Sequence, residues 1–242
     1  GKLRKVTLEN GVDCWGFSST QYVQDVVNNV EQYLETKGKK LVARAPAPMT
    51  NGYRPEVDIS EELSKDEASY YHSLIGVLRW IVELGRVDIN TEVSMLSSHL
   101  ALPRRGHLNE VFHIFAHLKK HHNSEMVYDP TDVDVDRGAF PREDWTYSIY
   151  GEDNLNEVLP TNMPTPLGKA FTMRVFVDSD HAGDKTTRCS RTGFMIFMNT
   201  ALIQWLSKKQ STIESSVFGA EFVAMKHGME TLHGLRYKLR MM

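Results

Sequence analysis

Hydrophobic and polar positions in the first half of the chain follow the period of a hairpin and then of helices. Residues 1–17 alternate around an Asn-Gly pair, which predicts two antiparallel strands joined by a tight turn. Apolar residues then recur at helical spacing over residues 19–38, 64–85, 88–102 and 106–122. Ser64 and Glu67 form a capping-box pattern at one helix start. These elements predict a compact helical subdomain after the hairpin.

The second half has a different pattern. Residues 129–168 are acidic and rich in proline, and the aromatic residues among them are expected to tether the segment to a neighbouring domain. Strand patterns follow over residues 171–180, 193–199 and 201–209, and a helical pattern covers about 215–239. A three-stranded antiparallel meander that leads into a helix predicts an α+β fold. The predicted units are residues 1–128, 129–168 and 169–242.

Composition adds limits rather than a function. The chain has 242 residues, of which 41% are hydrophobic, and its net charge of -3 gives no overall attraction to nucleic acid or to an anionic membrane. No apolar run is long enough to span a bilayer, so no membrane partner is expected. Cys14 and Cys189 match no zinc or redox spacing, which predicts two unpaired thiols and a cytoplasmic or nuclear location.

Carboxylates at the end of one predicted strand are the main candidate chemistry. Asp178 follows an apolar run, and Glu221 lies on the predicted helix next to small residues that permit close approach to a sheet. Phe222 and Met225 are expected to bury the flanks of that helix. Converging carboxylates can hold the pair of metal ions that phosphodiester hydrolysis needs. Three further residues in the following loop are expected to form a turn rather than coordinate: Asp180, His181 and Asp184.

Histidines on the helix at residues 106–122 allow three interpretations. His113, His117 and His121 lie one turn apart on one face, and two lysines follow His117. The face can be a solvated polar surface, a phosphate-contacting surface or a metal site. The sequence has no H-E-x-x-H pattern and no nearby cysteine, which weighs against a metal.

Several motifs together resemble copia-type retrotransposon polyproteins. "VFVDSDHAGD", "TRCSRTGFMIFM" and "LIQWLSKKQSTIESSVFGAEFVAM" are similar to the ribonuclease H region of that family. Upstream, "YRPEVDISEELS", "YYHSLIGVLRWI", "RVDINTEVSMLSSHLALP", "GHLNEVFHIFAHLKKH" and "MVYD" are similar to the segment after the polymerase palm. The resemblance implies a helical thumb or connection subdomain followed by a partial ribonuclease H-like fold, truncated at both ends.

The same resemblance implies the roles of particular residues. Asp178 and Glu221 correspond to two metal ligands of the family's acidic cluster, which binds Mg²⁺ or Mn²⁺ in the complete enzyme. The expected partners are an RNA–DNA hybrid or template-primer and the rest of the Pol polyprotein, in a cytoplasmic virus-like particle. Lysines expected at the nucleic-acid backbone are Lys119, Lys120, Lys208 and Lys209.

Departures from the family pattern limit the activity expected of this chain. The polymerase motif Y-V-D-D does not occur in the sequence, and neither does the family's later ribonuclease H aspartate in its D-N-x-x-A context. With two carboxylates the chain is expected to bind Mg²⁺ poorly and to be inert as a nuclease. Two alternatives stay open: a domesticated non-catalytic nucleic-acid-binding or interaction module on the same scaffold, and a plain α+β protein whose acids are surface features.

Overall fold

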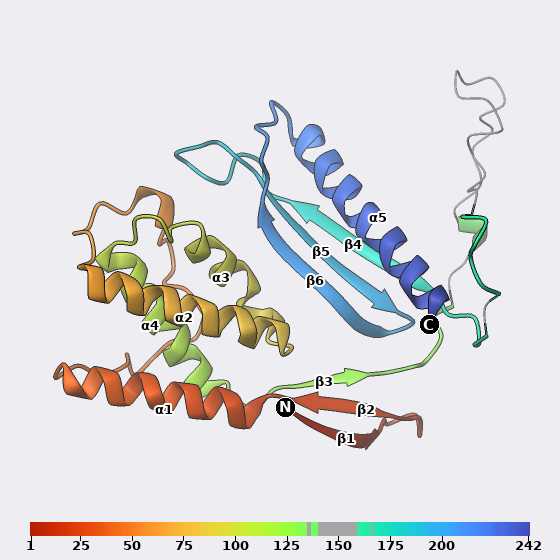
Figure 1. The fold of residues 1–242 in the computed structure, drawn as a ribbon, viewed down its shortest axis with the longest axis horizontal. Coiled ribbons are helices and arrows are strands. Elements are labelled where there is room, and N and C mark those ends of the chain that lie inside the picture. The colour runs from red at the N-terminus through yellow and green to blue at the C-terminus, as the bar shows by residue number, and fades with distance from the viewer. Residues whose placement is uncertain (135–136, 140–158, 166) are drawn as a thin grey trace.

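The computed structural model describes residues 1–134, 137–139, 159–165 and 167–242 (Figure 1). Its elements, in chain order, are β1 Lys2–Thr7, β2 Asp13–Ser18, α1 Thr20–Thr36, η1 Pro55–Val57, α2 Lys65–Glu83, η2 Val87–Ile89, α3 Asn90–Ser97, α4 Arg105–Lys120, β3 Glu125–Tyr128, η3 Arg137–Ala139, β4 Met173–Ser179, β5 Arg191–Met198, β6 Ala201–Lys209 and α5 Val217–Met241. Two three-stranded antiparallel sheets and their helices confirm the predicted α+β class. The predicted aromatic tether of residues 140–150 lies outside the described residues.

The predicted N-terminal hairpin is present and carries a third strand. β1 pairs with β2 antiparallel, and Gly11 at φ +79° makes the turn between them. That conformation is open to glycine because it has no Cβ. β3 then pairs with the other edge of β2, after the whole helical subdomain has intervened. The strand β3 was not predicted, because four residues are too few to show an alternation.

The helical subdomain is built from α1 to α4 around one apolar core. Helix α2 begins with the predicted capping box, in which Ser64 Oγ accepts from Glu67 N and the Glu67 carboxylate accepts from Ser64 N. Its most deeply buried residues come from all four helices: Val23, Tyr71, Leu78, Ile81, Leu96, Val111, Ile114, Phe115 and Leu118. The third predicted helix is shorter than expected, since residues 87–89 form the separate turn η2 and α3 ends at Ser97.

The second sheet has the strand order β4-β5-β6 and lies between α5 and the helical subdomain (Figure 1). A two-residue turn joins β5 to β6, and Asn199 takes φ +52° in it. Helix α5 packs on the β4 and β5 side through Ala220, Ala224 and Gly228, all three of which are buried. Small residues at this spacing bring the helix backbone close to the strands. This closeness fixes where the polar side chains of α5 reach the sheet.

Direct contacts join the second sheet to the helical subdomain. Ser94 Oγ on α3 donates to the carbonyl of Ser207 on β6 at 2.6 Å and also accepts from the Arg191 guanidinium at 2.6 Å. Trp205, on the face of β6 turned toward the helices, packs against the core of the helical subdomain. In the loop before β5, Thr186 Oγ1 donates to Glu56 O at 2.9 Å. The start of β5, the end of β6 and the loop before β5 are therefore held by the helical subdomain, whereas α5 packs on the β4 and β5 side of the sheet.

One expectation for α5 was wrong. Phe222 and Met225 do not bury the flanks of the helix, since they are 52% and 49% exposed. Phe218 and Met229 on the same side are also exposed, because α5 contacts the sheet through its row of small residues instead. Among the described residues, no helix combines the length and the hydropathy that crossing a membrane would require.

Candidate functional site

The candidate site lies where the start of α5 meets the end of β4. Ser216 caps α5, and its side chain accepts from the backbone N–H of Gly219 at 3.0 Å. Glu221 follows one turn later, half-buried, and its Oε1 accepts from the backbone N–H of Ser179 at 3.4 Å. Ser179 is the last residue of β4 and the neighbour of Asp178. The helix acid is thus brought to the strand end that carries the other candidate acid.

The pleat of β4 sets the direction of each side chain at this end. Val175 and Val177 face α5, since a Cβ built on Gly228 would lie 3.3 Å and 2.7 Å from their Cγ2 atoms. Asp178 alternates with Val177 and therefore projects on the opposite face, where it is exposed. Asp178 and Glu221 approach the strand end from opposite faces of the sheet.

The carboxylates at this end do not amount to a complete magnesium site. No group of three or more His, Cys, Asp or Glu side chains positioned for a metal occurs in the described part of the chain. Mg²⁺ requires octahedral oxygen coordination at short range and gives up its water reluctantly. Glu221 also uses one oxygen to accept the Ser179 amide. Metal binding by Asp178 and Glu221 stays a prediction, and these two residues are too few for tight binding.

Asp180 and Asp184 form the turn after β4, as the sequence predicted. Asp180 accepts from the backbone N–H of Arg191. Asp184 Oδ1 accepts from the amides of Thr186 and Thr187, and its Oδ2 lies 3.0 Å from Lys209 Nζ. Burial raises the pKa of the Asp184 carboxyl, but the amide bonds and Lys209 outweigh it and lower that pKa to about 2. These carboxylates close the loop of residues 180–190 against β5 and β6.

The four lysines expected at nucleic acid occupy two separate places. Lys119 Nζ lies 2.7 Å from Glu31 Oε1, and the next residue, Lys120, is exposed at the end of α4. Lys208 is exposed near the end of β6, next to Lys209 and its ion pair with Asp184. Two of the four cations are therefore already paired with carboxylates. Contact with a phosphate backbone stays a prediction for all four.

The Pro-rich connector at residues 43–54 covers part of the histidine face of α4, and His121 at the end of that face is exposed. His117 is buried and its Nδ1 lies 3.1 Å from Ala45 O. His113 Nε2 lies 3.1 Å from Ala47 O, and Glu110 accepts from the amide of Thr50. The interpretation as a solvated surface was therefore wrong for His117, which is buried. The connector lacks secondary structure of its own, so its backbone groups use α4 side chains as partners.

His107 extends the same arrangement to the start of α4. Its Nε2 lies 2.9 Å from Pro55 O, and its Nδ1 accepts from the backbone N–H of Arg104 at 3.0 Å. Histidines spaced along one helix face were visible in the sequence. Their role as partners of backbone carbonyls could have been inferred from the Pro-rich connector. Its prolines exclude a helix, so its carbonyls need hydrogen-bond partners from elsewhere in the chain.

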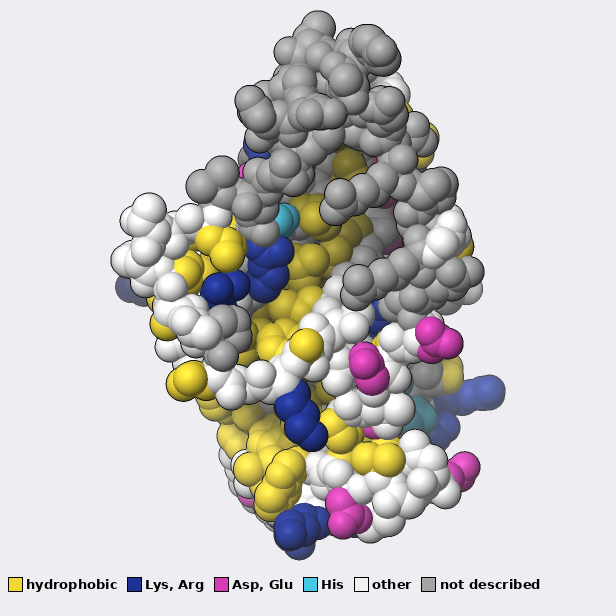
Figure 2. Space-filling view, turned by 90° about the vertical axis from the view of Figure 1, so that its right-hand side faces the viewer, with side chains coloured by type: hydrophobic (Ala, Val, Ile, Leu, Met, Phe, Trp, Pro, Cys, Tyr) yellow, Lys and Arg dark blue, Asp and Glu magenta, His cyan; other side chains and the backbone are white. Residues whose placement is uncertain are grey.

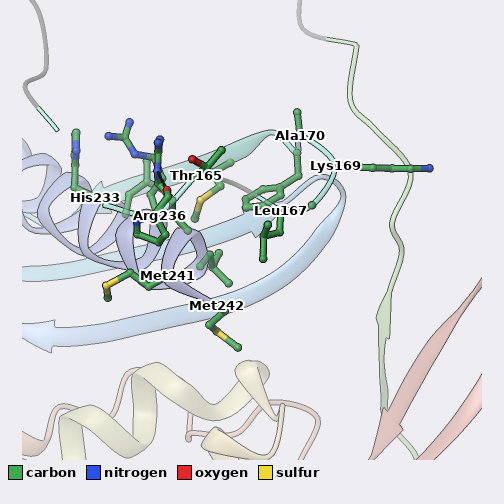
Figure 3. A pocket seen from close by; sticks show the side chains of 15 residues that line it. Thr165, Leu167, Lys169, Ala170, His233, Arg236, Met241 and Met242 are labelled. Atoms are coloured by element: carbon green, nitrogen blue, oxygen red, sulfur yellow. Dashed lines mark hydrogen bonds between the residues drawn. The ribbon is translucent and has the colours of Figure 1, made fainter. Parts of the chain in front are cut away.

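A large apolar cavity lies at the other end of α5. It measures about 830 Å³ and lies between residues 164–165 and 167–173 on one side and the last three turns of the helix on the other. Figure 2 shows hydrophobic side chains gathered in a hollow on the face that carries this end. Figure 3 shows Leu167 and Met241 at the wall, with the side chain of Lys169 directed away from α5. The cavity is remote from the acidic strand end.

Comparison with known proteins finds a distant relative. The chain is 22% identical over 209 residues to an uncharacterized mitochondrial protein, AtMg00810, of Arabidopsis thaliana, and the match covers 86% of this chain and 67% of that protein. No protein-family model matches the chain, and no solved structure matches it. The similarity extends over both the helical subdomain and the second sheet, and the name of the relative assigns no activity.

Proposed function

We propose that the chain is a segment of a copia-type retroelement polyprotein, comprising a helical thumb or connection subdomain and the first part of a ribonuclease H-like domain. The observation that carries the proposal is the position of Glu221, whose carboxylate accepts the Ser179 amide at the end of β4. The distant similarity to AtMg00810 over 86% of the chain is loose support for a retrotransposon relationship.

In this proposal Asp178 and Glu221 are two members of an acidic cluster whose other members lie in other parts of the polyprotein. The cluster belongs to an enzyme that hydrolyses the RNA of RNA–DNA hybrids, with divalent cations held between its carboxylates. The small residues of α5 set the helix close enough to β4 for Glu221 to reach the strand end. The described residues supply only these two ligands, so we expect the chain by itself to be inert.

A hybrid-cleavage assay tests the inertness. A labelled RNA–DNA hybrid is incubated with the chain in Mg²⁺ and, separately, in Mn²⁺. We expect no cleavage above that of the Asp178→Asn variant, which serves as the matched control. Turnover by the original chain that disappears in Asp178→Asn would show a working metal site and overturn the proposal that this chain is incomplete.

Sequencing the coding DNA on both sides tests the polyprotein assignment. We expect an upstream Y-V-D-D motif and a downstream strand that carries a further aspartate. The incomplete acid set also favours a second candidate, a non-catalytic descendant that binds nucleic acid or protein on the same scaffold. Stop codons or unrelated sequence on both sides, together with salt-sensitive binding of the hybrid, would favour that descendant.

A further inference from the structure

Gln210 immediately follows β6 and is buried, with 6% of its surface exposed. Its backbone N–H donates to Ser190 O at 2.8 Å, which fixes the residue at the strand end. Its side-chain Nε2 donates to Thr192 Oγ1 on β5 at 3.1 Å and to Ala220 O on α5 at 3.0 Å. A carbonyl can only accept, so the nitrogen of the amide is the atom that faces Ala220. One amide group therefore joins the sheet to the first turn of the helix.

The bond to Ala220 is not needed to complete the helix. Ala220 lies in the first turn of α5 and directly precedes Glu221. A carbonyl inside an α-helix already accepts from the N–H four residues later. The bond from Gln210 is therefore an additional one, made to the second lone pair of a carbonyl that the helix satisfies. Its effect is to fix the start of α5 relative to the sheet.

Packing alone does not fix the rotation of α5 about its own axis. The row of small residues sets how closely the helix approaches the sheet, but side chains of this size present a nearly smooth surface. A hydrogen bond weakens steeply away from its preferred angle, so it resists rotation. Between described residues, this constraint comes from the bond of Gln210 Nε2 to Ala220 O and from that of Ser179 N to Glu221 Oε1. The first bond is the shorter one.

An amide at position 210 carries a cost that an apolar side chain would not. In the described part of the chain, Gln210 Oε1 is buried without a hydrogen-bond partner. Such an atom lowers the stability of a fold, whereas an apolar side chain of similar shape can be neutral or stabilising in the same place. Stability alone therefore does not favour glutamine here. The two bonds of its nitrogen end, and what they hold in place, do.

The amide of Ser179 points away from β5. Asp180 N donates to Arg191 O, and the N–H groups of an antiparallel strand alternate between its two edges, so that of Ser179 faces the other edge. There it donates to Glu221 Oε1 at 3.4 Å. This bond forms only while the start of α5 holds Glu221 at the strand end. The Ser179 amide therefore reports the position of Glu221.

We propose that Gln210 is a positioning residue for Glu221. Its amide, anchored by Thr192 on β5, holds the backbone of Ala220 so that the next side chain, the Glu221 carboxylate, stays at the end of β4. Gln210 acts through that backbone and takes no part in the chemistry itself. The value of this position for a nuclease rests on the proposed function, whereas the contact itself does not.

Backbone hydrogen exchange, followed by ¹H–¹⁵N NMR without metal or nucleic acid, measures this contact. Glu221→Ala supplies the exchange rate of a Ser179 amide without its acceptor. A hydrogen bond of ordinary strength slows exchange by about two- to tenfold, and we expect Gln210→Leu to remove most of this protection at Ser179. The matched control Gln204→Leu makes the same replacement on β6 and should leave the rate unchanged. Equal rates at Ser179 in the original chain and in Glu221→Ala would overturn the proposal, because there would be no contact to hold.

The amide of Phe176 separates positioning from stability in the same spectra. It lies on the β5 side of β4, so its exchange rate follows opening of the sheet and not the position of Glu221. We expect Gln210→Leu to accelerate Ser179 several-fold more than Phe176, and equal acceleration of both would reduce Gln210 to a stabilising residue and overturn the proposal.

A second variant covers the case in which Gln210→Leu does not fold. Thr192→Val removes the hydroxyl that anchors the amide, and it should accelerate Ser179 in the same selective way but to a smaller extent. A Ser179 rate unchanged in every folded variant would also refute the positioning role. These rates do not depend on hybrid cleavage or on the flanking sequence. A selective response at Ser179 beside an unrelated flanking sequence would therefore keep this inference and remove the proposed function.

Discussion

Replacing Gly228 with alanine tests whether α5 is held against β4 as closely as described. Alanine in a helix interior is favoured over glycine by about 0.8–1.0 kcal/mol. The added Cβ would lie 2.7 Å from Val177 Cγ2 and 3.3 Å from Val175 Cγ2, and both are stiff β-branched side chains. Overpacking of this kind costs about 1–3 kcal/mol. We therefore expect Gly228→Ala to lower the free energy of unfolding by about 0–2 kcal/mol.

Gly234 is the matched control on the same helix. A Cβ built there meets nothing within 4 Å, so Gly234→Ala should raise the free energy of unfolding by about 0.8–1.0 kcal/mol. Urea unfolding followed by far-UV circular dichroism, at one fixed protein concentration, gives both values. The two variants should differ by about 1–3 kcal/mol, which is the overpacking cost alone. Equal stabilisation by both substitutions would refute the close approach of α5 to β4.

Three further predictions concern the supports of the fold. His117→Ala leaves the carbonyl of Ala45 without its partner and should lower the free energy of unfolding by about 1–3 kcal/mol, measured by urea unfolding against His121→Ala at an exposed position. Ser64→Ala removes the cap of α2 and should cost about 0.5–2 kcal/mol in the same assay. Asp184 has a folded-state pKa of about 2, below the ordinary value near 3.9, so its contribution is present above about pH 4 and is lost as the pH falls toward 2. Asp184→Asn should flatten the pH dependence of the urea midpoint in that window, and an unchanged slope would contradict this assignment.

Local signals in the sequence were sufficient for most of the fold. The Asn-Gly turn, the Ser64 capping box and the alternation in β4 to β6 each act over a few residues, so the elements they predict are present. The partner of β2 was not predictable, since β3 is four residues long and lies more than 100 residues away in the chain. Propensity and period carry no information on such distant pairing.

The candidate site was predicted only in part from the sequence. The sequence pointed to the proximity of Glu221 to the end of β4 through the small residues next to it, Gly219 and Ala220. The row of small residues that contacts the sheet, Ala220, Ala224 and Gly228, was not recognised in advance. The histidines of α4 were visible as a face, but their partners are backbone carbonyls of a connector without periodicity. The exposure of Phe222 and Met225 was not predicted. An apolar helix face indicates that the face is covered, but it does not identify the segment that covers it.

The central claim is that Glu221 of α5 reaches the end of β4 that also carries Asp178. Paramagnetic Mn²⁺ added to ¹⁵N-labelled chain tests it most directly, because Mn²⁺ broadens nearby amide signals even when little of it is bound. The account predicts that the amides of Ser179 and Glu221 broaden together at low Mn²⁺, and that Asp178→Asn removes the effect on both. Broadening centred on the loop at Asp184, or unchanged in Asp178→Asn, would contradict it.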